Sequence, residues 1–117
     1  MSLSSESEHR KKLNKIREDM TKRVNDAAKD IAKLEVDNFW KIDGVKGEAL
    51  RKTDEIRKSA AQDIAKLESD IAKSDLTSET KKTLMSDIKV LKKEIEDRVA
   101  ELRNRIGKVL SQNPKPQ

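Results

Sequence analysis

Cysteine is absent from this 117-residue chain, so neither a disulfide nor a thiolate metal site or nucleophile is available. Aromatic residues are almost as scarce, with one Phe and one Trp, and there are only three glycines and two prolines. Strands favour aromatic and β-branched runs bounded by Gly and Pro turns, so a β-rich fold lacks its usual residues. No apolar run approaches the roughly 20 residues of a membrane-spanning helix. These absences predict an all-α chain without a membrane span.

Charge is what the sequence has in abundance. Charged residues make up 42% of the chain and apolar residues 33%, with 27 bases against 22 acids and a net charge of +5. The excess of base permits contact with an anionic partner but does not require one, because acids and bases are interspersed. The first residues contain no hydrophobic signal region, so a cytoplasmic location is the default expectation. A mature secreted form stripped of its signal would look the same.

Apolar residues recur at helical spacing in three segments. We predict helices at about 8–39, 48–73 and 78–110, joined by a turn over residues 38–47 and by a short link capped by Thr77 or Ser78. The helices form one domain, residues 1–111, followed by a flexible tail, residues 112–117. Short links make neighbouring helices antiparallel, which predicts an elongated antiparallel three-helix bundle, a coiled-coil-like rod. An intermolecular bundle of helical hairpins is the alternative.

The most specific feature is a repeat at an offset of 33 residues: AAKDIAKLE at 27–35 and AAQDIAKLE at 60–68, a match that Asp37 and Asp70 extend. Helical spacing places its apolar members on one face, and its charged members are predicted to point outward. These charged residues are Asp30, Lys33 and Asp37 in the first copy and Asp63, Lys66 and Asp70 in the second. The repeat is either a recipe for close helix packing or a duplicated binding element. The packing interpretation predicts that Ile31, Leu34, Ile64 and Leu67 are among the most buried side chains.

Two groups of residues are candidates for partner binding. Phe39 and Trp40 stand beside the glycines of the predicted turn, where they would form either an exposed aromatic anchor or a plug against Ile106 and Leu110. The basic residues Arg10, Lys11 and Lys12 would meet Lys81 and Lys82 if the first and third helices start at the same end of the bundle. That basic end could contact phosphates; it could also be an ordinary solvated face.

Part of the chain resembles the helical domain of ribosome recycling factor. The likeness rests on EIRKSAAQDIAKL at 55–67, LTSE at 76–79, DIKVL at 87–91 and the lead-in EHRKKL at 8–13. The resemblance implies an elongated three-helix domain that contacts ribosomal RNA through basic helix faces, with Arg57 and Lys58 at the matching positions. The β-rich second domain of that family has no counterpart in these residues, and the spacing from His9 to Arg57 is longer than in the family.

No constellation for catalysis, cofactor binding or metal binding is found, so we expect no enzymatic activity, no cofactor and no small-molecule substrate. The chain has one histidine, scattered carboxylates, and neither a phosphate-binding loop nor a dinucleotide fingerprint. The leading prediction is a helical interaction module: an adaptor, spacer or assembly subunit that binds a protein partner or itself. The alternative is a basic RNA- or ribosome-binding helical protein.

Overall fold

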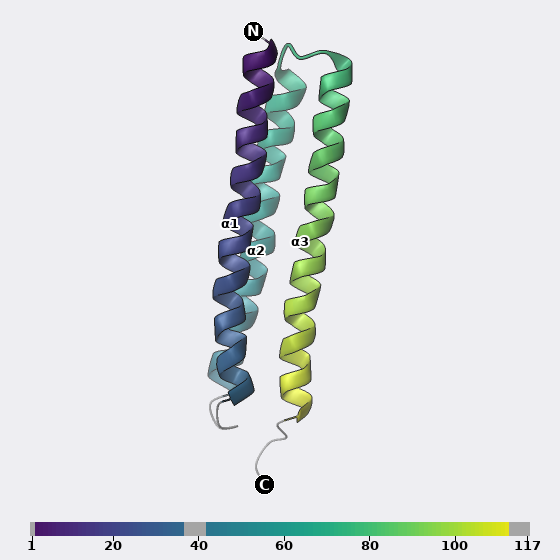
Figure 1. The fold of residues 1–117 in the computed structure, drawn as a ribbon. Coiled ribbons are helices and arrows are strands. Elements are labelled where there is room, and N and C mark those ends of the chain that lie inside the picture. Colours follow the sequence, from purple (N-terminus) through teal and green to yellow (C-terminus); the bar gives the residue numbers. More distant parts are fainter. Residues whose placement is uncertain (1, 37–41, 113–117) are drawn as a thin grey trace.

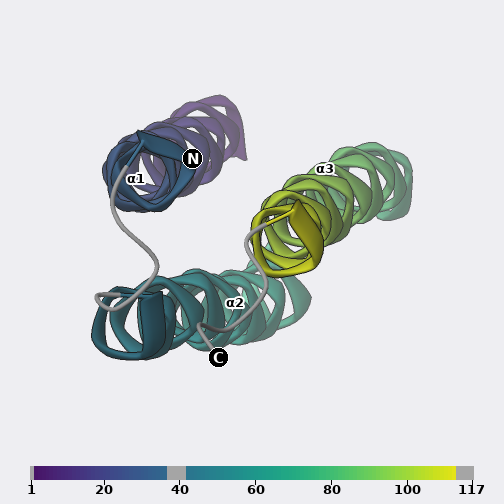
Figure 2. The ribbon, with the colours of Figure 1, turned by 90° about the horizontal axis from the view of Figure 1, so that it is seen from below.

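The computed structural model describes residues 2–36 and 42–112. They form α1 (Ser2–Val36), α2 (Ile42–Lys73) and α3 (Ser78–Gln112). The three helices run alongside one another (Figure 1), and the view along the rod shows them at the corners of a triangle, each in contact with the other two (Figure 2). The predicted all-α, elongated three-helix bundle is confirmed, and a single chain closes it.

Contacts between helices fix their directions. As α1 residue numbers rise from Lys12 to Asp30, their ion-pair partners on α2 fall from Asp70 to Lys52, so α1 and α2 are antiparallel. Arg10 and Arg17 of α1 instead reach Asp87 and Glu94 of α3, so these two helices are parallel. A 35-residue helix is about 52 Å long at a rise of 1.5 Å per residue, whereas the bundle is 16 Å across in both transverse directions.

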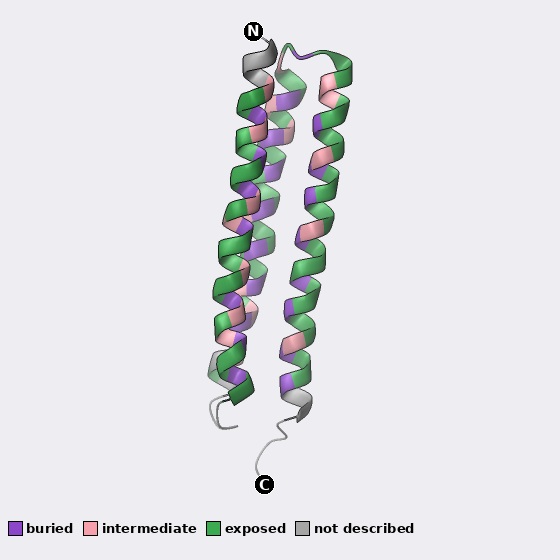
Figure 3. Cartoon of the chain, viewed as in Figure 1, coloured by how far each residue is buried: buried purple, intermediate pink, exposed green. Residues whose placement is uncertain are grey.

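The core is a single column of aliphatic side chains between the helices, seen as the purple stripes that face inward in Figure 3. It contains almost no polar atoms; among the described residues only Thr53 and His9 are buried polar residues. The Thr53 hydroxyl donates to the carbonyl of Ala49 at 2.8 Å, which satisfies it within its own helix. Both repeat copies contribute to this column, as predicted, since Ile31, Leu34, Ile64 and Leu67 are all at most 3% exposed.

The three apolar stripes change their spacing at one common level. Each contains two successive steps of four residues, centred on Met20 in α1, Ala60 in α2 and Ile95 in α3. Met20 and Ala60 border the same small cavity, and Ala60 and Ile95 line the same groove, so the three centres lie together. Together with the neighbouring step of three, two steps of four make an 11-residue repeat, which locally removes the left-handed supercoil that a strict heptad imposes. The middle of the bundle is therefore locally straight.

The link between α2 and α3 is closed by its own side chains. The Ser74 hydroxyl donates to the carbonyl of Ile71 at 2.6 Å, and the backbone N–H of Thr80 donates to Thr77 Oγ1 at 3.2 Å. Thr77 is therefore the N-cap of α3, one of the two predicted candidates, and Ser78 is the first helical residue. The link consists of the four residues 74–77, which reverse the direction of the chain. Its Leu76 side chain is buried in the core and holds the link against the bundle.

The predicted turn over residues 38–47 is wrong over its second half, because α2 begins at Ile42. Gly44 and Gly47 lie inside that helix with negative φ, and no atom outside the helix backbone lies within 4 Å of where a Cβ would stand. Glycine costs about 1 kcal/mol in a helix relative to Ala, and burial of Ala49 and Ile56 further along offsets such a local penalty. The helix α1 likewise begins at Ser2, six residues before its predicted start.

Replacing Gly47 with Ala tests the new start of α2. Since Gly47 is helical with open space around it, Gly47→Ala should raise the free energy of unfolding by up to about 1 kcal/mol. Gly107→Ala in α3, at a position predicted to be helical from the outset, is the matched control and should stabilise similarly. Urea denaturation followed by circular dichroism measures both. If Gly47→Ala lowers the free energy of unfolding and Gly107→Ala does not, the segment around residue 47 is a turn and not part of α2.

Adjacent residues of α3 test the core. Leu91 is fully buried and its neighbour Val90 is 54% exposed. Leu91→Ala removes buried methyl groups and leaves a cavity, so it should lower the free energy of unfolding by about 2–5 kcal/mol. Val90→Ala should change it by less than about 0.5 kcal/mol. Equal effects of the two substitutions in chemical denaturation would mean that α3 is rotated about its axis relative to the structure.

Candidate functional site

The seam between α1 and α3 is spanned by arginine–carboxylate pairs. Arg10 donates to Asp87 at 2.9 Å. Seven residues further along α1, Arg17 donates two hydrogen bonds to Glu94, at 3.1 and 3.3 Å. Arg105 donates to Glu35 at 3.0 Å near the far end. A planar guanidinium matches a carboxylate in two-point contacts, and this geometry adds directional preference to the attraction. These pairs fix the register of two parallel helices that are not connected directly.

The seam between α1 and α2 contains the least exposed ion-pair cluster. The Lys52 ammonium lies 2.7 Å from Asp30 Oδ2 and 3.2 Å from Asp26 Oδ2. The carboxylates of Asp30 and then Asp26 raise the pKa of Lys52 above its ordinary value. The prediction that Asp30 points outward is wrong, because its side chain is only 13% exposed and turns towards α2. The counterpart in the other repeat copy, Asp63, is exposed, so the two copies differ in their charged surroundings.

The seam between α2 and α3 is paired along its length. Arg103 donates to Asp54 at 2.7 Å and Lys92 to Glu68 at 3.0 Å. Arg57 Nε lies 3.4 Å from Glu96 Oε1. Exposed pairs of this kind contribute little individually, about 0–1 kcal/mol each. Together with the other two seams they disfavour a shifted register, because a slip by one turn would misalign many pairs at once.

Arginine and lysine are distributed differently over the described part of the molecule. Six of the eight arginines form ion pairs with described residues, whereas only three lysines do, namely Lys12, Lys52 and Lys92. Arginine suits directional pairing, and lysine is a strongly hydrated point charge on a flexible stem. The bundle therefore holds its arginines mainly in pairs and leaves most of its lysines on the outer faces of the helices.

The two groups of the predicted basic end lie at the same end of the rod, as its premise requires, but at different levels along it. Arg10 is paired with Asp87, Lys12 lies 3.5 Å from Asp70, and the Lys81 ammonium donates to the carbonyl of Ala72 at 3.1 Å. The offset of 77 residues between α1 and α3 places Lys81 and Lys82 level with residues 4 and 5, more than a turn before Arg10. The two groups thus share an end of the rod but not a level.

The other residues predicted to bind a partner differ in whether they are paired, exposed or outside the described residues. Arg57 is paired with Glu96, while Lys11, Lys58 and Lys82 are exposed and form no ion pair with any described residue. Phe39 and Trp40 lie outside the described residues, so the choice between anchor and plug stays a prediction. His9, which precedes the first basic group, is only 8% exposed and its Nδ1 is buried without a hydrogen-bond partner among the described residues.

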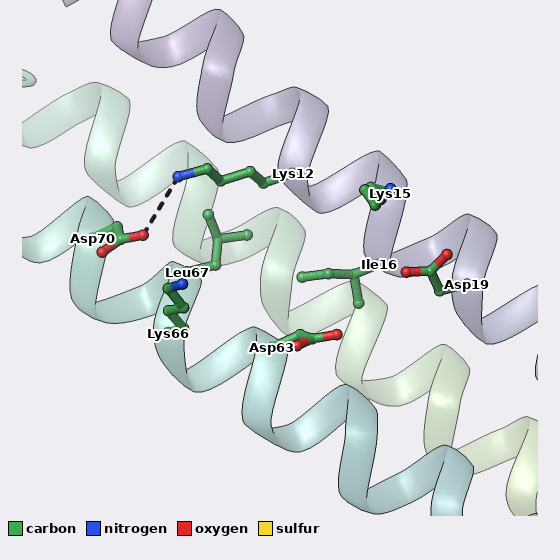
Figure 4. Close-up of a pocket in the computed structure, with 8 residues that line it drawn as sticks. All are labelled: Lys12, Lys15, Ile16, Asp19, Asp63, Lys66, Leu67 and Asp70. Atoms are coloured by element: carbon green, nitrogen blue, oxygen red, sulfur yellow. Dashed lines mark ion pairs between the residues drawn. The ribbon is translucent and has the colours of Figure 1, made fainter.

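A shallow groove of about 260 Å³ lies between α1 and α2 (Figure 4). Ile16 and Leu67 form its floor, and charged side chains of both signs surround it. The dashed contact in the figure is the pair between Lys12 and Asp70 at one end. The remaining residues around the groove are Lys15, Asp19, Asp63 and Lys66. The balance of charge favours neither a cationic nor an anionic small ligand.

A second groove, of about 450 Å³, lies between α2 and α3. Its apolar lining consists of the small residues Ala60 and Ala61 together with Ile64 and Ile95, which are almost fully buried. The pairs Arg57–Glu96 and Lys92–Glu68 close its two ends. The second repeat copy therefore lies between two grooves, one on each flank of α2. Sequence reasoning missed both grooves, since they depend on which helices become neighbours.

The described residues contain neither a candidate metal site nor a candidate membrane span. No cluster of three or more His, Asp or Glu side chains that could hold a metal ion occurs among them. None of the helices, as far as they are described, is apolar over enough of its length to span a bilayer.

No protein-family model, curated protein or solved structure matches this chain. The resemblance to ribosome recycling factor therefore stays a prediction that rests on the sequence alone. The proposed function therefore rests on the seams, the grooves and the outer faces of the helices.

Substitution of Lys52 tests the cluster between α1 and α2. Lys52→Gln leaves Asp30 and Asp26 without their partner, so the variant should unfold at lower urea concentration than the wild type at pH 7. The raised pKa means that the stabilisation is complete below the unfolded-state pKa of about 10.4 and is lost as pH rises through the higher folded-state value. The difference between the two proteins should therefore shrink above that pH.

Lys58→Gln is the matched control for this titration, since Lys58 is an exposed lysine of the same helix with no ion pair to any described residue. It should change the denaturation midpoint little at any pH. A difference between Lys52→Gln and wild type that stays constant into the alkaline range would show that the ammonium charge does not carry the stabilisation.

Proposed function

We propose that the protein is a non-enzymatic helical interaction module, an adaptor, spacer or assembly subunit that docks on another macromolecule. The observation that carries the proposal is how the side chains are divided. Large aliphatic residues fill the core, and most lysines outside the seams lie on the outer faces. Ion pairs of acids with five arginines and three lysines span the seams, namely Arg10, Arg17, Arg57, Arg103, Arg105, Lys12, Lys52 and Lys92. Long solvated faces on a rod with a fixed register suit extended contact with a partner.

The dimensions support a role as a spacer or platform. Three helices of 32 to 35 residues keep the two ends of the rod about 50 Å apart, and a bundle with paired seams is stiff compared with a flexible linker. The two grooves beside the second repeat copy add shallow relief to one part of this surface. They are open and bordered by charge, unlike the concave apolar pockets that enclose small ligands.

A basic RNA- or ribosome-binding helical protein is the second candidate. It is favoured by the unpaired lysines on the outer faces, since sequence-independent binding to nucleic acid depends mainly on cationic contacts with phosphates. The resemblance to ribosome recycling factor points in the same direction. Arg57, which matches that family, is held against Glu96 and would have to leave this pair to contact RNA.

Affinity purification from the native host tests the proposal. The tagged chain is crosslinked in parallel lysates, with and without nuclease treatment, and captured material is compared. We expect a partner, or a second copy of the chain, at micromolar concentration. A nuclease-resistant protein partner supports the adaptor, and a nuclease-sensitive one supports the second candidate. Leu91→Asp, which places a charge in the core and should unfold the rod, is the control bait and should lose the partner. Absence of any partner or self-association would contradict the module.

A further inference from the structure

Five lysines follow the outer face of α1 in one line: Lys11, Lys15, Lys22, Lys29 and Lys33. At 100° per residue their directions around the helix agree within about 40°, on the side opposite the buried stripe. All five are exposed. We call them the α1 lysine strip, and it extends over about 33 Å of helix.

The charges of the strip are available to a partner. None of the five lysines forms an ion pair with any described residue. Three acids border the strip, each about 20° outside the arc of the five lysines: Glu18 on one side, and Glu8 and Asp26 on the other. Asp26 lies 3.2 Å from the Lys52 ammonium, so much of its charge is already compensated. The five lysines therefore outnumber the three acids beside them, and one of these acids is already paired.

We propose that the α1 lysine strip docks on a nucleic-acid duplex through its phosphates. The strip is about as long as one turn of a duplex, roughly 34–36 Å, and a straight helix keeps its five cations in line. Lysine and phosphate form sequence-independent contacts, and the strip contains no arginine or amide side chain with which to read base edges. The duplex is thus recognised by charge and shape.

Two other anionic partners fit the strip less well. Recognition of single strands uses aromatic side chains on which bases stack, and no Phe, Tyr or Trp is interleaved with the lysines of the strip between residues 11 and 33. An acidic protein helix needs apolar anchors at the centre of its interface, and Val36, at the very end of the described strip face, is the one large apolar side chain there. The proposal rests on the second candidate function, a basic RNA- or ribosome-binding helical protein, and names the duplex form of its partner and the surface that contacts it.

Fluorescence anisotropy of the full chain with a labelled duplex of about 20 base pairs tests the proposal. Affinity should fall steeply as salt rises from about 50 to 200 mM, since each phosphate contact contributes about 0.9 to the slope of log affinity against log salt. The variant with Lys11, Lys15, Lys22, Lys29 and Lys33 all replaced by Gln should bind at least about tenfold more weakly and lose most of this slope.

A second variant controls for net charge. It replaces an equal number of exposed lysines on α2 and α3, Lys58, Lys73, Lys89, Lys93 and Lys108, by Gln. Because both variants have the same net charge, the strip is supported only if the control keeps its affinity within about threefold of wild type. Equal weakening of both variants would overturn the proposal, as would the absence of duplex binding at low salt. Circular dichroism confirms that each variant is folded.

Glu18 gives a test in the opposite direction. Glu18→Gln removes an acid beside the middle of the strip and should strengthen duplex binding about two- to fivefold, while Glu101→Gln, an exposed acid of α3, should not. Tighter binding of a single strand or of polyglutamate than of the duplex would assign the strip to another partner and overturn the proposal. If duplex binding fails while purification yields a nuclease-resistant protein partner, the strip proposal falls and the interaction module stands.

Discussion

The narrow aliphatic column between the three helices is the interaction on which the rest of the structure depends. Its members are almost all Leu, Ile, Val, Met and Ala, so burial of methyl and methylene groups, at about 25 cal/mol for each Å² removed from water, holds the helices together. A column this thin cannot accept much variation in side-chain volume. The small Ala60 beside the long Met20, with a cavity of about 10 Å³ between α1 and α2, shows how closely neighbouring positions compensate each other.

Aliphatic burial alone leaves the helices free to slide, because a Leu–Ile column looks similar after a shift of one turn. The seam pairs remove this freedom. Arg10 and Arg17 recur at the heptad interval and meet acids at the same interval on α3, so the correct register satisfies both and a shifted one satisfies fewer. The seam pairs also account for the positive charge of the outer faces, because acids that are paired at the seams do not neutralise the lysines on the outer faces. The surface charge is thus a by-product of how register is specified.

Local spacing was sufficient to predict the three helices, the four buried repeat residues and a cap at Thr77 or Ser78, because each depends on residues within a few turns of one another. The start of α2 was missed because two glycines signal a turn locally, while packing further along the helix decides in favour of helix at Gly44 and Gly47. The roles of Arg10 and Arg57 were missed for a different reason: their partners lie 77 and 39 residues away, and only the register of the closed bundle brings them together. The α1 lysine strip was also missed, because its five lysines are four or seven residues apart in the sequence and become neighbours only on the face of a helix.

The parallel seam between α1 and α3 has a consequence for the order of assembly. Helices α2 and α3 meet through a four-residue link, so their pairs close small loops, whereas Arg10 and Asp87 are separated by almost the whole chain. The entropic cost of closing a loop grows with the number of residues in the loop. Contacts between α1 and α3 require the chain to reverse direction twice, once before α2 and once after it. We therefore expect contacts of the α1–α3 seam, such as Arg10–Asp87 and Arg17–Glu94, to form late in folding. Opening along this seam would expose the aliphatic column while α2 still contacts both of its sequence neighbours.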